Sequence, residues 1–303
     1  MEKETFLKRL NRQKSSYMFI ALPLILFAVF QLIPLFISFF LSFTQYDVVH
    51  PPKFVGLDNY RNILFHDPVF WKAMGNTAFY VLGVVPVGIF IALLLAVAVD
   101  QKIKFKNFFE SMFFLPTITS VVAVSVIWKW LYAGEKYGLL NYFIMKFGVQ
   151  PIDWLASPEW TLPPIMIMSI WAGIGYNMIL FLVGLQTIPK TMYEEAEIYG
   201  AGFWRKFFDV TLPLLRPTIV FVFLMSFISS FQVFEQVYVM TGGQGGIGGV
   251  LNSGLTIVAY MYDKGFQKFQ MGYASAIAYI VAFCVFILTV MNKRFIKEQE
   301  IHY

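Results

Sequence analysis

The sequence predicts an all-α, polytopic membrane protein with six transmembrane helices. The composition supports this fold class, because 58% of the 303 residues are hydrophobic, only 14% are charged and the mean hydropathy is +0.65. Soluble globular domains are about 45–50% apolar and about 25% charged. These values therefore exclude a soluble enzyme, a disordered chain and a nucleic-acid-binding domain. The second observation is that the hydrophobic residues gather in six long stretches.

Each of the six stretches supplies about 20 mostly apolar residues, the length that an α-helix needs to cross a hydrocarbon layer of roughly 30 Å. The first is too long for a signal-peptide core and has no small-residue cleavage site behind it, so we expect a true span. Prolines inside the first three spans are tolerated where neighbouring groups satisfy the freed carbonyl. The predicted spans are residues 17–43, 76–99, 111–131, 162–185, 217–239 and 271–291.

Positive charge predicts how the spans are oriented. Lys and Arg concentrate on the cytoplasmic side of membrane proteins, and fifteen of the 23 lie in the two tails and in the links after the second and fourth spans. We therefore expect cytoplasmic tails at 1–16 and 292–303 around a transmembrane domain at 17–291. At the outer end of the third span, we expect the Lys129 side chain to reach water between aromatic neighbours.

Several kinds of chemistry are not indicated. No phosphate-binding loop ending in Gly-Lys-Ser/Thr occurs, and the Gly-rich match at Gly243, Gly245 and Gly248 follows no predicted strand, so it indicates a turn. The single cysteine, Cys284, excludes a multi-cysteine metal site within the chain. The only carboxylate inside a span is Glu235, whereas ion-coupled transporters usually keep several ionisable groups at mid-membrane. We expect no cofactor, and a pathway whose energy comes from another protein.

Two helical segments can line such a pathway. In the fifth span, polar side chains fall on one side of a helix, within roughly 160°. Gly173 and Gly175 add small residues to a polar patch in the fourth span. Hydroxyls, amides and aromatic faces suit an uncharged sugar, although small and hydroxyl residues also pack helices together, and this alternative stays open. The candidate pathway residues are Tyr176, Asn177, Ser226, Ser229, Ser230, Gln232 and Gln236.

The link after the fourth span, residues 186–216, is longer than a membrane connection needs to be. Thr191 is the expected N-cap of a helix over 192–199, with Glu194 as its capping-box partner and Gly200 as its stop. A second helix over 203–210 is expected to end before Leu212-Pro213. Two short charged helices indicate a docking element for another protein, and the alternative is an amphipathic helix that lies on lipid.

This link resembles the EAA signature of the membrane subunits of bacterial ABC importers. The pattern Glu-X-Ala, three residues, Gly, nine residues, aliphatic-X-Leu-Pro keeps its spacing here, with Glu195 replacing the usual second-position Ala. The stretches at 54–60, 185–189 and 234–243 resemble the carbohydrate-importer, maltose-type branch. The signature residues that the resemblance assigns to ATPase coupling are Glu194, Glu195, Ala196, Gly200, Leu212 and Pro213.

The resemblance implies an all-α, type I importer permease in a bacterial inner membrane. It further implies a second, similar permease, two cytoplasmic ATPase subunits that hydrolyse ATP, and an extracytoplasmic solute-binding protein that delivers a sugar or oligosaccharide. The chain itself would be no enzyme and would bind no nucleic acid. Two alternatives are a secondary transporter or channel without partners, and a membrane-embedded enzyme, which would need clustered His, Asp or Glu near one interface.

Overall fold

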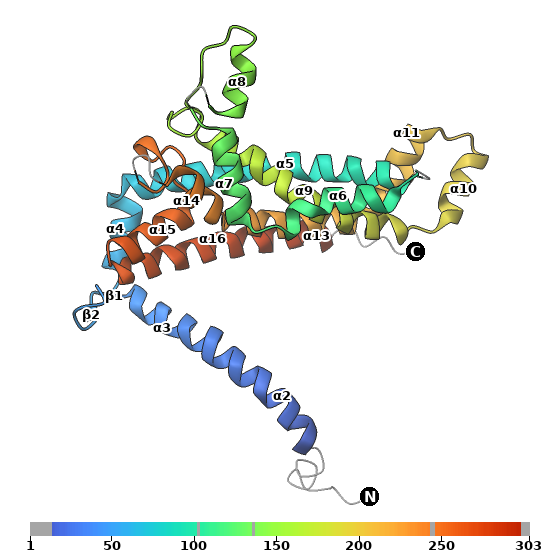
Figure 1. The fold of residues 1–303 in the computed structure, drawn as a ribbon. Helices are drawn as coiled ribbons and strands as arrows, with labels where there is room; N and C mark the ends of the chain where they lie inside the picture. Colours follow the sequence, from blue (N-terminus) through green and yellow to red (C-terminus); the bar gives the residue numbers. More distant parts are fainter. Residues whose placement is uncertain (1–13, 102–103, 135–136, 243–245, 298–303) are drawn as a thin grey trace, which may run out of the picture. The chain divides into compact units, whose positions relative to one another are not determined.

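The computed structural model describes residues 14–101, 104–134, 137–242 and 246–297, and they are overwhelmingly helical (Figure 1). Among these residues, four helices are long and apolar enough to cross a membrane, and each of two bent helix pairs can complete one further span. The chain forms two compact units, which are described one at a time. The first lies within 1–65 and 264–280, and the second within 66–263 and 281–303.

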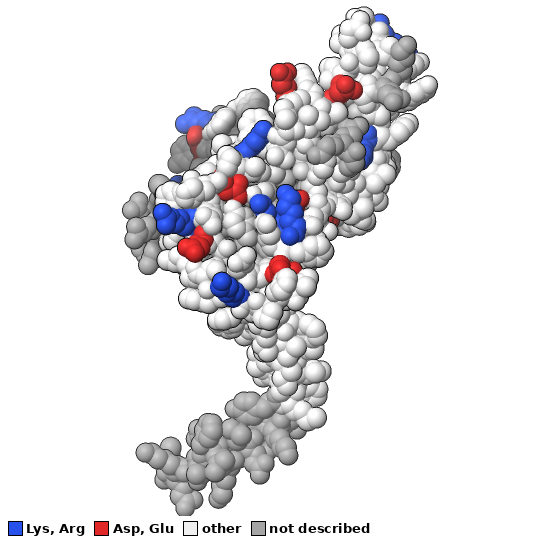
Figure 2. All heavy atoms as spheres, turned by 90° about the vertical axis from the view of Figure 1, so that its left-hand side faces the viewer, with Lys and Arg blue, Asp and Glu red and all other residues white. Residues whose placement is uncertain are grey.

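The first unit begins with a long apolar helical arm. It consists of α2 (Lys14–Phe27), a π-helical turn (Ala28–Leu32) and α3 (Ile33–Ser42). Pro34 cannot donate a backbone hydrogen bond, and the wider turn ends two residues before it. Residues 18–42 contain no charged side chain, and the face of the arm seen in Figure 2 is white where it is coloured. The predicted first span is confirmed, because Met18–Ser42 meets the length and hydropathy of a crossing helix.

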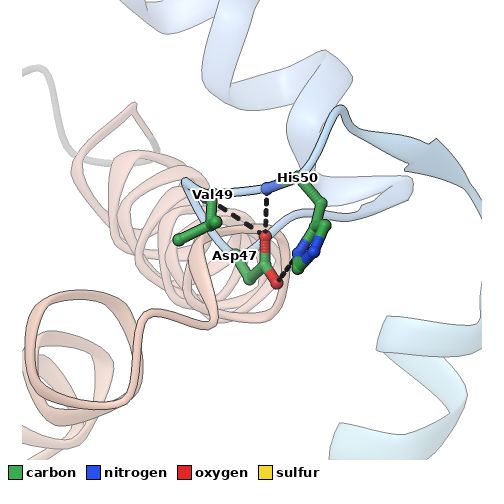
Figure 3. Close-up of polar contacts among 3 residues, drawn as sticks. All are labelled: Asp47, Val49 and His50. Carbon is green, nitrogen blue, oxygen red and sulfur yellow. Dashed lines mark hydrogen bonds and ion pairs between the residues drawn. The ribbon is translucent and has the colours of Figure 1, made fainter.

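A short turn structure follows the arm. Strands β1 (Thr44–Gln45) and β2 (Lys53–Phe54) pair antiparallel, and α4 (Asp58–His66) follows them. Between the strands, the Asp47 carboxylate accepts hydrogen bonds from the backbone N–H groups of Val49 and His50 and from the His50 ring (Figure 3). The backbone N–H of His50 is the main cause that lowers the pKa of Asp47. The carboxylate thus fixes the turn.

The second unit is built on three long helices. They are α5 (Pro68–Asp100), α9 (Leu162–Gln186) and α13 (Arg216–Phe231), with α5 packed against both of the others. Asp67 caps α5 by accepting from the N–H groups of Val69 and Phe70, and Pro68 fills the first helical position. This cap explains why α5 begins eight residues before the predicted span at 76–99. The prediction for 162–185 matches α9 within one residue.

The third predicted span is not one helix. It is formed by α6 (Lys106–Ile118) and α7 (Val121–Leu131), which meet at 94°. Thr119 and Ser120 between them have extended backbone, and Pro116 removes a donor from the last turn of α6. The prediction of a continuous helix over 111–131 is therefore wrong at its centre.

The fifth predicted span is also interrupted. The helix α13 ends at Phe231, and α14 (Glu235–Thr241) starts after three non-helical residues. The carbonyl of Val233 accepts a hydrogen bond from the buried Thr256 hydroxyl at 2.9 Å, and Phe234 has φ −141°. The continuous helix predicted over 217–239 is therefore wrong, because a segment that follows α14 in the chain supplies a hydrogen bond at the break.

The segments that connect the long helices are braced by side chains that bond to backbone groups. In the segment around α8 (Leu139–Met145), the fully buried Asn141 amide bonds to backbone groups of Ala133, Gly134 and Ile152 and to the Trp154 ring. A 3₁₀ turn (Val250–Asn252), α15 (Ile257–Tyr262) and a π-helical turn (Asp263–Gln267) precede the last helix, α16 (Met271–Lys297). The helix α16 fulfils the prediction of a sixth span.

The Lys129 side chain bonds to backbone carbonyls, a contact that the sequence did not predict. It is half-buried, and Nζ donates to the carbonyls of Val239 at 3.0 Å and Gly242 at 2.7 Å. These carbonyls lie at the end of α14, where a helix has no partners of its own for its last C=O groups. The lysine thus ties α7 to α14. Gly243 and Gly245 of the Gly-rich match lie outside the described residues, whereas Gly248 is buried at a turn with φ +92°.

Candidate functional site

A cavity of about 420 Å³ lies among α5, α6, α9, α13 and α14. This volume falls in the range of roughly 300–1,000 Å³ that is typical of small-molecule sites. The structure brings six of the seven predicted pathway residues to its wall. They are Tyr176 and Asn177 of α9, Ser226, Ser229 and Ser230 of α13, and Gln236 of α14.

The seventh pathway residue, Gln232, does not line the cavity. It is the exposed C-cap of α13, where the helix breaks, so the single polar face that we predicted for the fifth span does not continue through it. Gln236 reaches the cavity from a separate helix instead. The small patch in α9 is also divided. Gly173 lines the cavity, whereas a Cβ on Gly175 would lie 2.0 Å from the carbonyl oxygen of Phe113, so Gly175 serves helix packing.

Two helices meet in the cavity wall through side chains. The Asn177 amide donates to the Ser226 hydroxyl at 3.2 Å and so joins α9 to α13. Sequence reasoning missed three further hydroxyl groups of the wall, those of Tyr80, Thr117 and Ser169. Each comes from a different helix, α5, α6 or α9, so no single helical face marks the three together. Only the packing of α5, α6 and α9 shows that these residues share one cavity.

The link between α9 and α13 is a helical hairpin. The helix α10 (Lys190–Ile198) begins after Pro189 and ends in a Schellman motif, in which Ala201 N–H donates to the Ala196 carbonyl and Gly200 N–H to that of Glu197. Gly200 has φ +71°, a conformation that L side chains rarely adopt. The predicted stop at Gly200 is confirmed, whereas the predicted N-cap at Thr191 is wrong, since the helix starts before it.

The second arm of the hairpin is longer than predicted. It runs through α11 (Phe203–Lys206), a π-helical turn (Phe207–Thr211) and α12 (Leu212–Leu214), and then bends by 66° into α13. The helix therefore does not end before Leu212-Pro213. A π turn directly precedes Pro213, where the chain cannot donate to the preceding turn.

Two contacts brace the hairpin. Lys206 Nζ lies 2.7 Å from a carboxylate oxygen of Glu197, and the hydroxyls of Tyr193 and Thr211 lie 3.0 Å apart. The hydrogen bond from Lys206 and its charge lower the pKa of Glu197. Tyr193 and Leu212 also pack on the hydrophobic core of the second unit. The two arms are thus held together and fastened to the ends of α9 and α13.

The hairpin leaves a mixed surface in solvent, beyond the ends of α9 and α13 (Figure 1). Glu194 and Glu195 are exposed on α10, and Ala196 is half-buried. Near the tip, Ile198, Tyr199 and Trp204 are 82%, 84% and 66% exposed. Of the other signature residues, Gly200 forms the turn, Pro213 is exposed and Leu212 faces the core. Exposed apolar side chains beside charged ones are typical of a surface that binds another protein.

Comparison with known proteins decides the family. Residues 84–299 match the family described as "Binding-protein-dependent transport system inner membrane component". The chain belongs to this family. It is therefore a membrane component of a transport system and not an enzyme, and the resemblance predicted from the EAA signature is confirmed.

Relatives of this transport component cover nearly its whole length. The arabinooligosaccharides transport system permease protein AraP of Bacillus subtilis is 33% identical over 283 residues, which are 93% of this chain and 88% of AraP. The lactose transport system permease protein LacF of Rhizobium radiobacter is 34% identical over 291 residues, 94% and 95% of the two chains.

Solved structures confirm the fold. A chain of a bacterial ABC transporter involved in the import of the acidic polysaccharide alginate matches with a TM-score of 0.84 at 21% identity, over 98% of this chain and 100% of that chain. A chain of the bacterial alginate ABC transporter, in complex with an alginate pentasaccharide-bound periplasmic protein, matches with a TM-score of 0.79 at 22% identity, over 95% and 96%. The predicted all-α importer permease fold is thus confirmed.

Proposed function

We propose that this chain is one of two permease subunits of an ABC importer that carries a sugar or oligosaccharide across a bacterial inner membrane. Its membership in a binding-protein-dependent transport family supports a delivered substrate. The names of its relatives, which include arabinooligosaccharide and lactose permeases, support the substrate class. The observation that carries the proposal is the braced, exposed hairpin at 186–216, because a transporter without partners has no use for it.

The hairpin is the proposed contact for cytoplasmic ATPase subunits. Glu194 and Glu195 supply polar contacts and Gly200 keeps the turn tight, while Ala196 lets a partner approach α10 closely. Leu212 and Pro213 support the hairpin from its base, since Leu212 packs on the core. A rigid hairpin transmits a push or pull from the ATPases to α9 and α13, both of which line the cavity.

The cavity is the proposed sugar path. Its hydroxyls and amides can replace the water that surrounds a sugar, and the Tyr176 ring offers an apolar face. Gln232 is proposed to lie beside the sugar path and not in its wall, at the break between α13 and α14. The helix-packing alternative applies to Gly175. A solute-binding protein delivers the sugar from outside, and the second permease completes the path.

The tails 1–16 and 292–303 are proposed to be cytoplasmic, on either side of the membrane domain 17–291. The charge distribution in the sequence supports this topology. It places the hairpin in the cytoplasm, where ATP is available to the partner subunits.

Substitution of Glu194 by Lys tests the coupling role. We expect the variant to insert into the membrane normally but to lose most ATPase co-purification and at least about tenfold in sugar uptake, since it reverses one charge at the contact. Lys190→Glu, a charge reversal at the start of the same helix, is the control and should retain co-purification. Normal uptake by Glu194→Lys would contradict the proposed contact.

A further inference from the structure

The wall of the cavity contains no charged side chain. None of its lining residues, all of which are in the described part of the chain, is Asp, Glu, Lys, Arg or His. Its polar groups are the neutral hydroxyls and amides of Tyr80, Thr117, Tyr176, Asn177, Gln236 and the serines of α9 and α13. The wall is therefore polar enough for hydrogen bonds but offers no fixed counter-charge.

A positive charge on a neighbouring helix is already engaged. Lys129 belongs to α7, whose first residue, Val121, lines the cavity. Its Nζ donates to the carbonyls of Val239 and Gly242, at the other end of α14 from Gln236. The lysine therefore stabilises the end of a helix and does not face the cavity wall.

A negative charge next to a lining residue disfavours anions as well. Glu235 is exposed and directly precedes Gln236 at the start of α14. No residue of α9 is charged, and Arg216 lies at the opposite end of α13, ten positions before Ser226. The lysines of α5 and α6 are engaged as well, Lys72 with the Leu251 carbonyl at 2.6 Å and Lys106 with the Asp100 carboxylate at 3.7 Å. From the described helices that surround it, an anion in this cavity therefore meets one nearby negative charge and no free cation nearby.

These surroundings select by charge. An anionic group that leaves water for a site without a cation loses hydration that hydrogen bonds from neutral groups replace only in part. A neutral, hydroxyl-rich ligand exchanges its water for the Asn177 and Gln236 amides and the hydroxyls of α13 at little net cost. We infer that the cavity admits uncharged saccharides and rejects saccharides that carry carboxylate or sulfate groups. This inference rests on the proposed function.

A direct binding measurement tests the selection at the cavity itself. Purified permease–ATPase complex without the solute-binding protein is dialysed to equilibrium against labelled neutral oligosaccharides and against the same oligosaccharides oxidised at C6 to uronates. We expect the neutral forms to bind at least about tenfold more tightly. Uronate binding that equals or exceeds neutral binding would overturn the inference and leave sugar transport intact as the function.

A charge placed in the wall separates this selection from general damage. Gln236→Lys adds a cation, and Gln236→Met is its uncharged control of similar length. We expect Gln236→Lys to narrow the neutral-to-uronate affinity ratio at least about tenfold and Gln236→Met to leave the ratio unchanged. An unchanged ratio in Gln236→Lys would show that selection lies elsewhere and would overturn the inference.

Uptake by the complete transporter, with its solute-binding protein, is the second measurement. Uptake of neutral saccharides without uronates supports the inference, whereas uptake of uronates at a comparable rate contradicts it. If neither class is taken up from a broad panel, the proposed sugar transport itself fails. The two proposals therefore fail through different results.

Discussion

At the scale of single residues, one ion pair holds the two arms of the link in register. Glu197 is on α10 and Lys206 on α11, and their charged atoms lie 2.7 Å apart across the Gly200 turn. The sequence places them nine positions apart, a spacing that no helix pairs. The pair therefore depends on the turn, which explains why sequence reasoning did not find it although it found the turn itself.

Removal of this charge should weaken coupling without unfolding the protein. For Glu197→Gln we expect a roughly twofold to fivefold loss of sugar uptake, the scale of an exposed ion pair, because the arms lose one of their two cross-links. Uptake and substrate-stimulated ATPase activity in proteoliposomes measure the effect. Asp209→Asn, which breaks the Arg205–Asp209 pair within one arm, is the matched control. Equal losses of uptake in both variants would show that the Glu197–Lys206 pair matters no more than the pair within one arm.

The same pair predicts a pH dependence. Lys206 lowers the pKa of Glu197 in the folded protein, so the pair stabilises the hairpin above the ordinary glutamate pKa and ceases to do so as the pH falls through the lowered value. The contribution is therefore constant between pH 6 and 8. The uptake ratio of Glu197→Gln to the natural protein should stay flat in that window, and a steep change there would point to another group.

At the scale of elements, the Schellman turn at Gly200 should be the least replaceable part of the link. Replacing Gly200 by alanine should lower the stability of the turn by ~1–2 kcal/mol, because an L residue is strained at φ +71°. A Cβ at this position would meet no atom within 4 Å, so the cost comes from the backbone alone. We therefore expect Gly200→Ala to lower uptake about fivefold to thirtyfold if the turn is needed as it stands. Gly202→Ala is the matched control, because Gly202 has φ −72° and the same open surroundings. Similar uptake by both variants would show that the turn conformation does not matter.

The short helix α14 is stabilised by the two hydrogen bonds that Lys129 donates to its C-terminal end. Hydrogen bonds from a charged donor contribute about 1.5–3 kcal/mol, so Lys129→Met should lower the melting temperature of the purified complex measurably. Lys129→Arg keeps a donor and should recover part of the loss. Lys146→Met is the control, since that ammonium lies over the exposed Tyr142 ring at 4.5 Å. An unchanged melting temperature in Lys129→Met would mean that other contacts hold α14.

Hydropathy predicts where the chain enters the membrane but not where its helices break. The match at α9 is within one residue, because length and hydropathy alone define a continuous apolar helix. The break at Thr119–Ser120 lies three residues after Pro116, and the break at 232–234 lies where the Thr256 hydroxyl bonds to Val233. The hydrogen bond between Thr256 and Val233 joins residues 23 positions apart, and no local sequence pattern predicts such a contact. In the same way, the pathway residues on α13 were predicted by periodicity, whereas Tyr80 and Ser169 were not.

At the scale of the whole molecule, the functional proposals require the cavity wall and the hairpin to be parts of one mechanical unit. Both α9 and α13 line the cavity, and the hairpin is the chain that connects them. Tyr193 and Leu212 fasten it to the same core that holds α5 and α9 together. The proposed coupling therefore passes from the hairpin to the cavity wall through packed side chains.

We predict that α8 and the hairpin lie on opposite sides of the membrane. If α9 crosses the membrane once, the two segments that flank it lie on opposite sides. In a Cys284→Ala background, which removes the only natural cysteine, we expect Tyr142→Cys on α8 to react with a membrane-impermeant maleimide in intact cells. Thr191→Cys on α10 should react only after permeabilisation, and the exposure of both native side chains makes the comparison fair. Reversed labelling would place the hairpin outside, away from any ATPase, whereas labelling of both sites in intact cells would show that α9 does not span the membrane.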